Sequence, residues 1–109
     1  MIEDVVITHE NVRDSITLDG KDIYSALLTV GLEKGTDFYL KIRFLDLTIA
    51  EFKQLAELTK EKRAIPISSP FFTREGFDIT QIVIFNFSAK SDYTMSWEAL
   101  SDKDINLIL

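Results

Sequence analysis

The chain has 109 residues, of which 46% are hydrophobic and 28% are charged, and its net charge at pH 7 is −6. This length predicts a single domain over residues 1–109 that buries roughly two thirds of its unfolded surface. The acidic excess argues against a protein whose main task is to hold a nucleic-acid backbone, and the absence of Cys excludes disulfides, thiolate catalysis and Cys-ligated zinc.

The N-terminus, Met1-Ile2-Glu3-Asp4, is acidic where a secretory signal would be basic. The apolar run Gln81–Phe85 has the length of a strand and is much too short to cross a membrane. We therefore expect a cytoplasmic protein with no membrane partner, or a virion-associated one if the chain is of phage origin.

The first 47 residues alternate apolar and polar side chains, which is typical of an antiparallel meander. Residues 9–11 follow a short first strand and are predicted to form a turn. Asp19-Gly20 is a strong signal for a type I′ hairpin turn. This hairpin sets Ile16 beside Ile23 and leads into a long strand that ends at Leu32.

A second hairpin is predicted from residues 21–32 and 36–46, closed by Glu33-Lys34-Gly35 with Gly35 in the left-handed position of a bulge. This register places Leu28 opposite Leu40. The other pairs on the same, buried face would be Tyr24 with Phe44, Ala26 with Ile42, and Val30 with Phe38. A slip of one residue would turn the whole apolar set outward, so we expect the register to be strongly specified.

Thr48-Ile49-Ala50-Glu51 forms a capping box that starts a helix over about residues 49–62. Its apolar stripe, which we expect to lie on the sheet, consists of Ile49, Phe52, Leu55, Ala56 and Leu58. Pro66 then predicts an edge strand or a loop. Residues 77–87 are apolar on both faces, which predicts a central strand, and residues 93–99 alternate as its partner.

These elements predict an α+β domain that is mainly an antiparallel β-sandwich or a partly open β-barrel, with one helix packed on it. The chain is poorly supplied with catalytic groups, because its single His, His9, has no obvious partner and Ser68-Ser69 has no nearby base. Asp102 and Asp104 lack the further ligands of a calcium loop. We expect no enzyme activity, no cofactor and no metal site.

Tyr39, Lys41 and Arg43 project from one face of one predicted strand, where an aromatic ring and two cations could bind a single-stranded nucleic acid. The order of a meander, a helix and two further strands loosely resembles an OB-type barrel, which implies such a function. An ordinary structural interpretation is also available, because Asp14 could pair with Arg43 across the sheet. Nucleic acid is therefore an unfavoured partner on a chain of this charge.

A contact surface for another protein is predicted at Pro70-Phe71-Phe72 with Arg74, because two adjacent aromatic rings cannot both face the core of a strand-like segment. The alternative is that both rings tuck under the loop. The last residues, 101–109, carry apolar side chains that could form a docking tail, namely Ile105, Leu107 and Leu109.

We interpret the chain as a small non-enzymatic protein-interaction or assembly module that binds a protein partner or itself as a homo-oligomer. Small phage or viral assembly proteins and small acidic inhibitors use a comparable plan, which is an analogy at the level of fold alone. The competing hypothesis is an OB-like protein that binds single-stranded nucleic acid.

Overall fold

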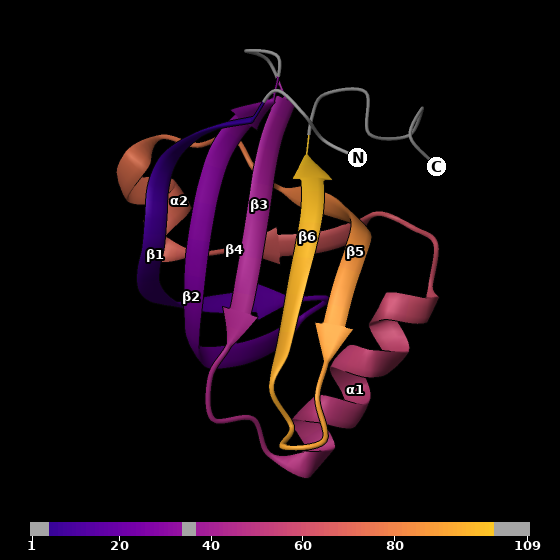
Figure 1. Ribbon diagram of the computed structural model, residues 1–109. Coiled ribbons are helices and arrows are strands. Elements are labelled where there is room, and N and C mark those ends of the chain that lie inside the picture. The colour runs from indigo at the N-terminus through magenta and orange to yellow at the C-terminus, as the bar shows by residue number, and fades with distance from the viewer. Residues whose placement is uncertain (1–4, 34–36, 102–109) are drawn as a thin grey trace.

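The computed structural model describes residues 5–33 and 37–101, which form six strands and two helices (Figure 1). The strands are β1 (Val5–Leu18), β2 (Lys21–Glu33), β3 (Asp37–Phe44), β4 (Ile65–Ser68), β5 (Gln81–Ala89) and β6 (Met95–Ser101), and the helices are α1 (Ile49–Lys60) and α2 (Pro70–Glu75). The predicted α+β class, mainly antiparallel with one longer helix, is confirmed. Within the described part, neither helix is long and apolar enough to cross a membrane.

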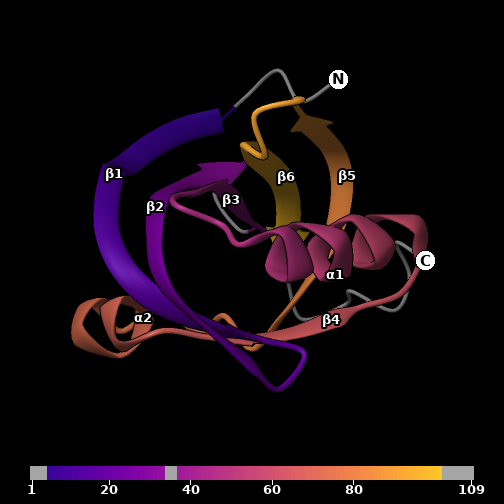
Figure 2. The same ribbon diagram turned by 90° about the horizontal axis from the view of Figure 1, so that it is seen from below.

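The strands follow one another in the order β1-β2-β3-β6-β5-β4 and close into a barrel (Figure 2). The short strand β4 closes it, because Leu18 of β1 pairs with Ile67 while Gln81 of β5 pairs with Pro66. The expectation of an edge strand or loop at Pro66 is therefore wrong. The Pro66 carbonyl accepts a hydrogen bond from the Asp19 amide at 3.0 Å, and the next residue, Ile67, donates its amide to the Thr80 carbonyl at 3.0 Å, so β4 is bonded on both sides although proline has no N–H.

The core fills the inside of this ring. Trp97 of β6 is completely buried and its ring meets that of Phe44 edge to face, with centroids 4.9 Å apart. Large side chains from every strand surround it, among them Ile16, Leu28, Leu40, Ile65 and Ile82. The inward positions of β6 alternate strictly with half-exposed ones, as expected of a strand with one face on the core.

β1 is one long bent strand and not two strands separated by a turn. The segment predicted as a turn instead forms bulges, with register shifts between Ile7 and His9 and between His9 and Val12. Asn11 takes the left-handed conformation (φ 52°), which accommodates the extra residue. The predicted turn at Asp19-Gly20 is confirmed, since both residues have positive φ and the flanking residues pair directly.

The β2–β3 hairpin forms as predicted but its register differs by two residues. Leu28 lies opposite Ile42, and Val30 lies opposite Leu40. A shift of two keeps the same side chains inward, because side chains alternate with period two. Tyr24 is the exception: a bulge in β2 turns it outward and leaves it 80% exposed. The predicted bulge at Gly35 lies outside the described residues.

α1 lies across the lower end of the ring (Figure 2), and its capping box is confirmed. The Glu51 amide donates to the Thr48 hydroxyl at 3.1 Å, and the Thr48 amide donates to the Glu51 carboxylate at 2.9 Å. Leu55 is the one fully buried residue of the stripe, while Phe52 is partly buried and Ile49 is exposed. The helix therefore closes the ring's end more than it covers a sheet face.

Replacing Thr48 by Ala should lower the free energy of unfolding by about 1 kcal/mol, because the Glu51 amide loses the hydroxyl oxygen that accepts its hydrogen bond. Urea unfolding followed by circular dichroism measures this loss. A Thr59→Ala variant is the matched control, since its hydroxyl donates to the Ala56 carbonyl within the same helix and caps nothing. Equal losses in the two variants would contradict a specific capping role.

α2 is a short helix where a loop was predicted. Its signals are local: the Ser69 hydroxyl accepts the Phe71 amide at 3.2 Å, Pro70 occupies the first turn, and Gly76 ends the helix in the left-handed conformation (φ 72°). The Ser69 hydroxyl also donates to the Ser15 carbonyl at 2.9 Å, which fastens α2 to β1.

Candidate binding surfaces

The outer face of the sheet gathers polar side chains around Arg43 of β3. In an antiparallel sheet, directly paired residues project to the same face. The pairings across five strands form one outward row: Arg13 of β1, Leu27 of β2, Arg43, Ser96 of β6 and Ser88 of β5. Arg13 and Arg43 are exposed, so this row carries two cations and no carboxylate.

The neighbouring row is held together by Glu98. The Tyr39 hydroxyl donates to one oxygen of Glu98 at 2.6 Å, and the side-chain amide of Asn86 donates to the other oxygen at 2.9 Å. Burial and the nearby Glu98 carboxylate raise the pKa of Tyr39, while the hydrogen bond from Tyr39 lowers the pKa of Glu98. Lys41 is the direct cross-strand neighbour of Glu98.

The predicted trio of Tyr39, Lys41 and Arg43 does share one face, but its members differ in what they can do. Tyr39 is only 8% exposed and its hydroxyl is engaged, so its ring is not free to stack on a base. Lys41 is half-buried beside a carboxylate. Arg43 is the exposed member.

The predicted ion pair between Asp14 and Arg43 is wrong. Asp14 pairs with Ala26, whose side chain faces the core, whereas Arg43 pairs with Leu27 on the opposite face. Asp14 instead forms an ion pair with Arg74 of α2, with 3.0 Å between the Asp14 Oδ2 and Arg74 Nη2 atoms. Arg74, predicted as a contact residue, is thus partly engaged within the fold.

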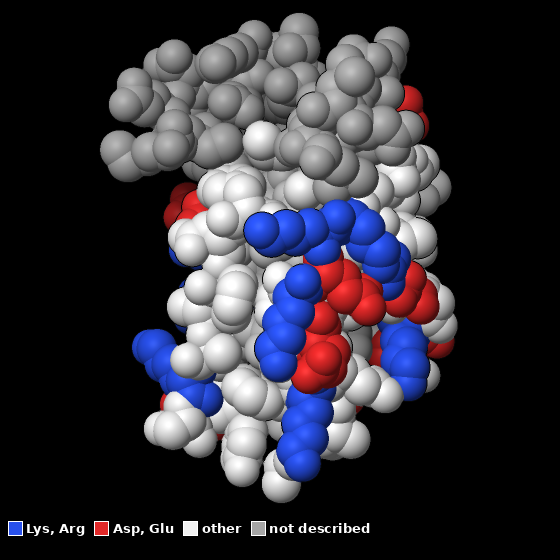
Figure 3. All heavy atoms as spheres, turned by 90° about the vertical axis from the view of Figure 1, so that its right-hand side faces the viewer, with Lys and Arg blue, Asp and Glu red and all other residues white. Residues whose placement is uncertain are grey.

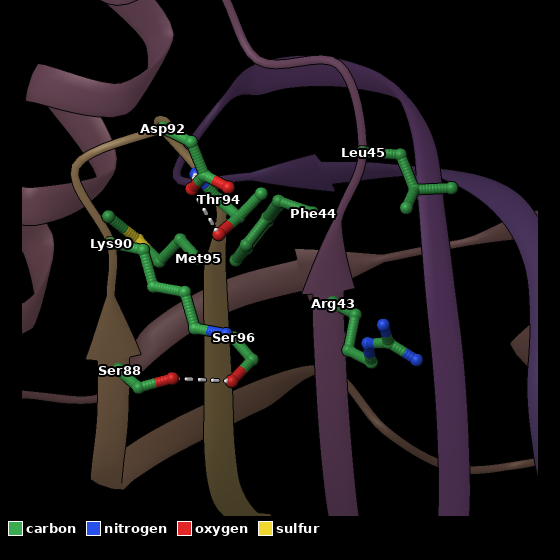
Figure 4. Close-up of a pocket in the computed structure, with 9 residues that line it drawn as sticks. All are labelled: Arg43, Phe44, Leu45, Ser88, Lys90, Asp92, Thr94, Met95 and Ser96. Atoms are coloured by element: carbon green, nitrogen blue, oxygen red, sulfur yellow. Dashed lines mark hydrogen bonds between the residues drawn. The ribbon is translucent and has the colours of Figure 1, made fainter.

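Two hollows flank Arg43. One, of about 250 Å³, lies between β3 and the β5–β6 hairpin (Figure 4) and is lined by Arg43, Phe44, Leu45, Ser88, Lys90, Asp92, Thr94, Met95 and Ser96. The other, of about 330 Å³, is lined by Ile7, Glu10, Asn11, Thr29, Tyr39, Lys41 and Arg43. The first is bordered by two cations, Arg43 and Lys90, and by three hydroxyl side chains.

A separate, apolar surface lies along β5. We name it the β5 patch: Phe85 and Phe87 of β5, Tyr93 of the β5–β6 turn, and Ile49 at the start of α1. Each of these side chains is between 44% and 53% exposed. The turn and the start of α1 meet at the lower end of the molecule (Figure 1), where the rings of Phe52 and Tyr93 contact edge to face with centroids 5.4 Å apart.

Phe71 and Phe72, predicted to provide an exposed ring, are 2% and 3% exposed. The expectation that one of them faces solvent is wrong, because the pair sits on a helix and not on a strand-like segment. The ring of Phe71 packs between His9 and Phe77, with centroids 5.5 and 5.6 Å away. The other predicted contact residues, Ile105, Leu107 and Leu109, lie outside the described residues.

His9 joins β1 to α2. Its Nε2 atom lies 2.9 Å from the Glu75 carboxylate, and its Nδ1 atom lies 3.0 Å from the Thr8 hydroxyl. These contacts hold the imidazole against the Phe71 and Phe77 rings, which is a structural role. Over residues 5–33 and 37–101, His, Asp and Glu side chains do not gather in groups of three that could hold a metal ion.

The β5 patch and Lys90 were missed by sequence reasoning. The apolar residues on both sides of β5 predicted a strand buried on both faces, but a register shift between Ile84 and Asn86 leaves Phe85 as an extra residue. The uncharged run from Ile79 to Ala89, which contains Phe85 and Phe87, was the available signal.

Comparisons of the chain with protein-family models, with curated proteins and with solved structures find no match.

Proposed function

We propose that the chain is a small non-enzymatic interaction module that self-associates through the β5 patch. The observation that carries the proposal is the exposure of four large apolar side chains on β5, on the turn that follows it and at the start of α1. Exposed aromatic and aliphatic side chains of this size are typical of protein–protein contacts. Aromatic side chains are also over-represented among the residues that dominate binding energy.

A second copy of the chain is the partner that the charges favour. With a net charge of −6, two copies repel one another over most of their surfaces. The β5 strand carries no charged residue, and the run from Ile79 to Ala89 is uncharged throughout. Two identical β5 surfaces can therefore meet without bringing like charges together, in the isologous arrangement of a two-fold dimer.

The surroundings of the β5 patch differ from it in charge. Figure 3, which faces the side of the molecule where α1 and β5 lie, shows charged side chains of both signs gathered together with uncharged surface beside them. Around α1 these charges neutralise one another, because Lys60 pairs with Glu57 and Arg63 pairs with both Glu61 and Asp19. Because these ion pairs are exposed to solvent, they would border the apolar contact and add little to its affinity.

The free side of β5 adds a second source of contact. Among the described residues, β4 pairs with β5 only at Gln81 and Ile82, so the strand from Val83 to Ala89 has β6 as its single strand partner. Natural sheets protect such an edge with Lys, with Pro or with a covering helix; this segment has neither Lys nor Pro, although α1 contacts β5. Burial of apolar area contributes about 25 cal/mol per Å², against an association cost of several kcal/mol, so a weak, concentration-dependent dimer is expected.

Replacing both Phe85 and Phe87 by Ser should shift the midpoint between monomer and dimer to a concentration at least about tenfold higher, because the aromatic area of the contact is lost. Light scattering or sedimentation over a concentration series measures the midpoint. Tyr24→Ser is the matched control, since Tyr24 is a highly exposed aromatic residue of β2 that lies outside the patch.

A wild-type chain that stays monomeric at the highest attainable concentration would refute self-association. An equal shift in the Tyr24→Ser control would refute the β5 patch as its site. Circular dichroism and a melting curve for each variant show whether the fold is retained, so that loss of association is not confused with unfolding.

The alternative hypothesis of an OB-like single-strand binder has one supporting feature and one opposing feature. A helix between the third and fourth strands of a small barrel fits that plan. Against it, Tyr39 is buried and engaged with Glu98 on the face where a base would have to stack. Self-association is therefore the function we propose.

A further inference from the structure

We propose that the hollow between β3 and the β5–β6 hairpin binds a phosphate group, with Lys90, Arg43 and the hydroxyls of Ser88 and Ser96 as its ligands (Figure 4). This proposal is independent of self-association. It rests on two cations that form no direct ion pair among the described residues, on a hydrogen-bond donor that is not used within that part of the fold, and on a hollow large enough to hold the group.

The positive charge comes from two elements. Lys90 follows β5, and Arg43 projects from the outer face of β3. Within residues 5–33 and 37–101, neither side chain is within ion-pair distance of a carboxylate, although acidic residues outnumber basic ones by 18 to 12 in the whole chain. What distinguishes these two cations is that they border the same hollow, where both are available for an external anion.

The donors lie between the two cations. The Oγ atoms of Ser88 and Ser96 are 3.0 Å apart and share one hydrogen bond, for which either can be the donor. Two hydroxyl groups carry two protons, so one O–H of the pair is left to donate to a ligand. In Figure 4 the Lys90 side chain extends in the direction of Ser96, and Lys90, Ser88 and Ser96 line the same hollow.

Asp92, the one carboxylate among the described residues that line the hollow, is already hydrogen-bonded within the β5–β6 turn. Asp92 accepts the Thr94 amide at 3.2 Å and the Thr94 hydroxyl at 2.8 Å, and these bonds lower its pKa. The Lys90 amide donates to the Thr94 carbonyl at 2.9 Å, and the Tyr93 amide donates to the Lys90 carbonyl at 3.0 Å. The turn thus holds Asp92 in place. Its charge weakens anion binding but is outnumbered by the two cations.

Phosphate fits these donors better than a carboxylate does. A carboxylate is planar with two oxygens, whereas phosphate presents oxygens in several directions to an ammonium, a guanidinium and a hydroxyl at once. Arg43 extends away from Ser96 in Figure 4, and because it is exposed it can turn toward the hollow. A volume of about 250 Å³ also leaves room for a small organic group attached to the phosphate.

Titration of the ¹⁵N-labelled full-length chain with sodium phosphate at constant ionic strength tests the proposal. We expect saturable shifts in the amide signals of Arg43, Ser88, Lys90 and Ser96, and none with sodium chloride. Lys90→Ala should weaken phosphate binding about tenfold, the expected effect of losing one charge-assisted contact. Lys53→Ala is the matched control, because it removes an equal charge from an exposed position on α1.

Parallel titrations with a small phosphate monoester and with a single-stranded oligonucleotide distinguish the sources of the phosphate. Tighter binding of the monoester than of free phosphate at the same residues supports a small phosphorylated ligand. Absence of saturable phosphate shifts, or equal weakening in the Lys90→Ala and Lys53→Ala variants, would overturn the site. Oligonucleotide binding without phosphate binding would also overturn it, in favour of a nucleic-acid surface.

Discussion

Replacing Trp97 by Ala should lower the free energy of unfolding by about 3–5 kcal/mol, because Trp97 is the largest fully buried side chain among the described residues. Trp97 is completely buried at the centre of the ring. The substitution removes its contact with Phe44 and leaves a cavity bordered by side chains of several strands, which cannot all move inward because they are fixed in a closed barrel.

Equilibrium unfolding in urea is the measurement, with the slope of the transition used to check that the unfolded state is unchanged. Tyr24→Ala is the control, because it shortens an aromatic side chain that is 80% exposed and should change stability by less than about 0.5 kcal/mol. A loss for Trp97→Ala as small as that of the control would mean that the ring is not packed around this residue.

Replacing Phe71 by Ala should also cost about 3–5 kcal/mol, although the sequence marked this residue as a contact for a partner. Its ring is 2% exposed and touches His9, Phe72 and Phe77, so it fastens α2 to the barrel. Because Phe71 lies outside the β5 patch, the variant should retain the wild-type tendency to self-associate when it is measured below its melting temperature.

Phe52→Ala provides the comparison for this result. Phe52 is an aromatic residue of α1 that is only partly buried. Phe52→Ala should therefore lower the free energy of unfolding by less than Phe71→Ala does. Phe71→Ala with near-native stability but reduced association would restore the original interpretation of Phe71 as an interface residue. A larger loss for Phe52 than for Phe71 would indicate that α1, and not α2, carries more of the packing.

Local patterns in the sequence predicted much of the fold. Alternation identified the inward faces of β2, β3 and β6, the Asp19-Gly20 turn fixed the first hairpin, and the capping box placed the start of α1 at the right residue. Each of these features depends on neighbours within a few residues. That dependence explains why they can be read without knowing the rest of the structure.

The parts that were mispredicted depend on distant contacts. A bulge in β2 places Ala26 opposite Asp14 and turns Tyr24 to the outside, and no residue pattern in a single strand marks it clearly. Closure of the ring through β4 depends on pairing with two strands that are far away in sequence. The burial of Phe71 and Phe72 depends on the short helix α2, whose Ser69-Pro70 start and Gly76 end were present but were interpreted as loop signals.

In the candidate sites, too, local features could be predicted from the sequence and features that depend on distant contacts could not. Tyr39, Lys41 and Arg43 could be placed on one face because they alternate along one strand. The residues that decide their roles come from other elements: Glu98 engages Tyr39, and Lys90 borders the hollow beside Arg43. The β5 patch could not be predicted, because a run of apolar residues is as typical of a buried strand as of an exposed contact surface. Only the three-dimensional pairing shows which of its aromatic rings remain exposed.

A dilution series of the ¹⁵N-labelled chain, followed by amide chemical shifts, tests self-association through the β5 patch most directly. The account predicts concentration-dependent shifts for Val83–Ala89, Tyr93 and Ile49, while the signals of α2 and of Tyr24 stay constant. Shifts that concentrate on α2, or spectra that do not change with concentration, would contradict it.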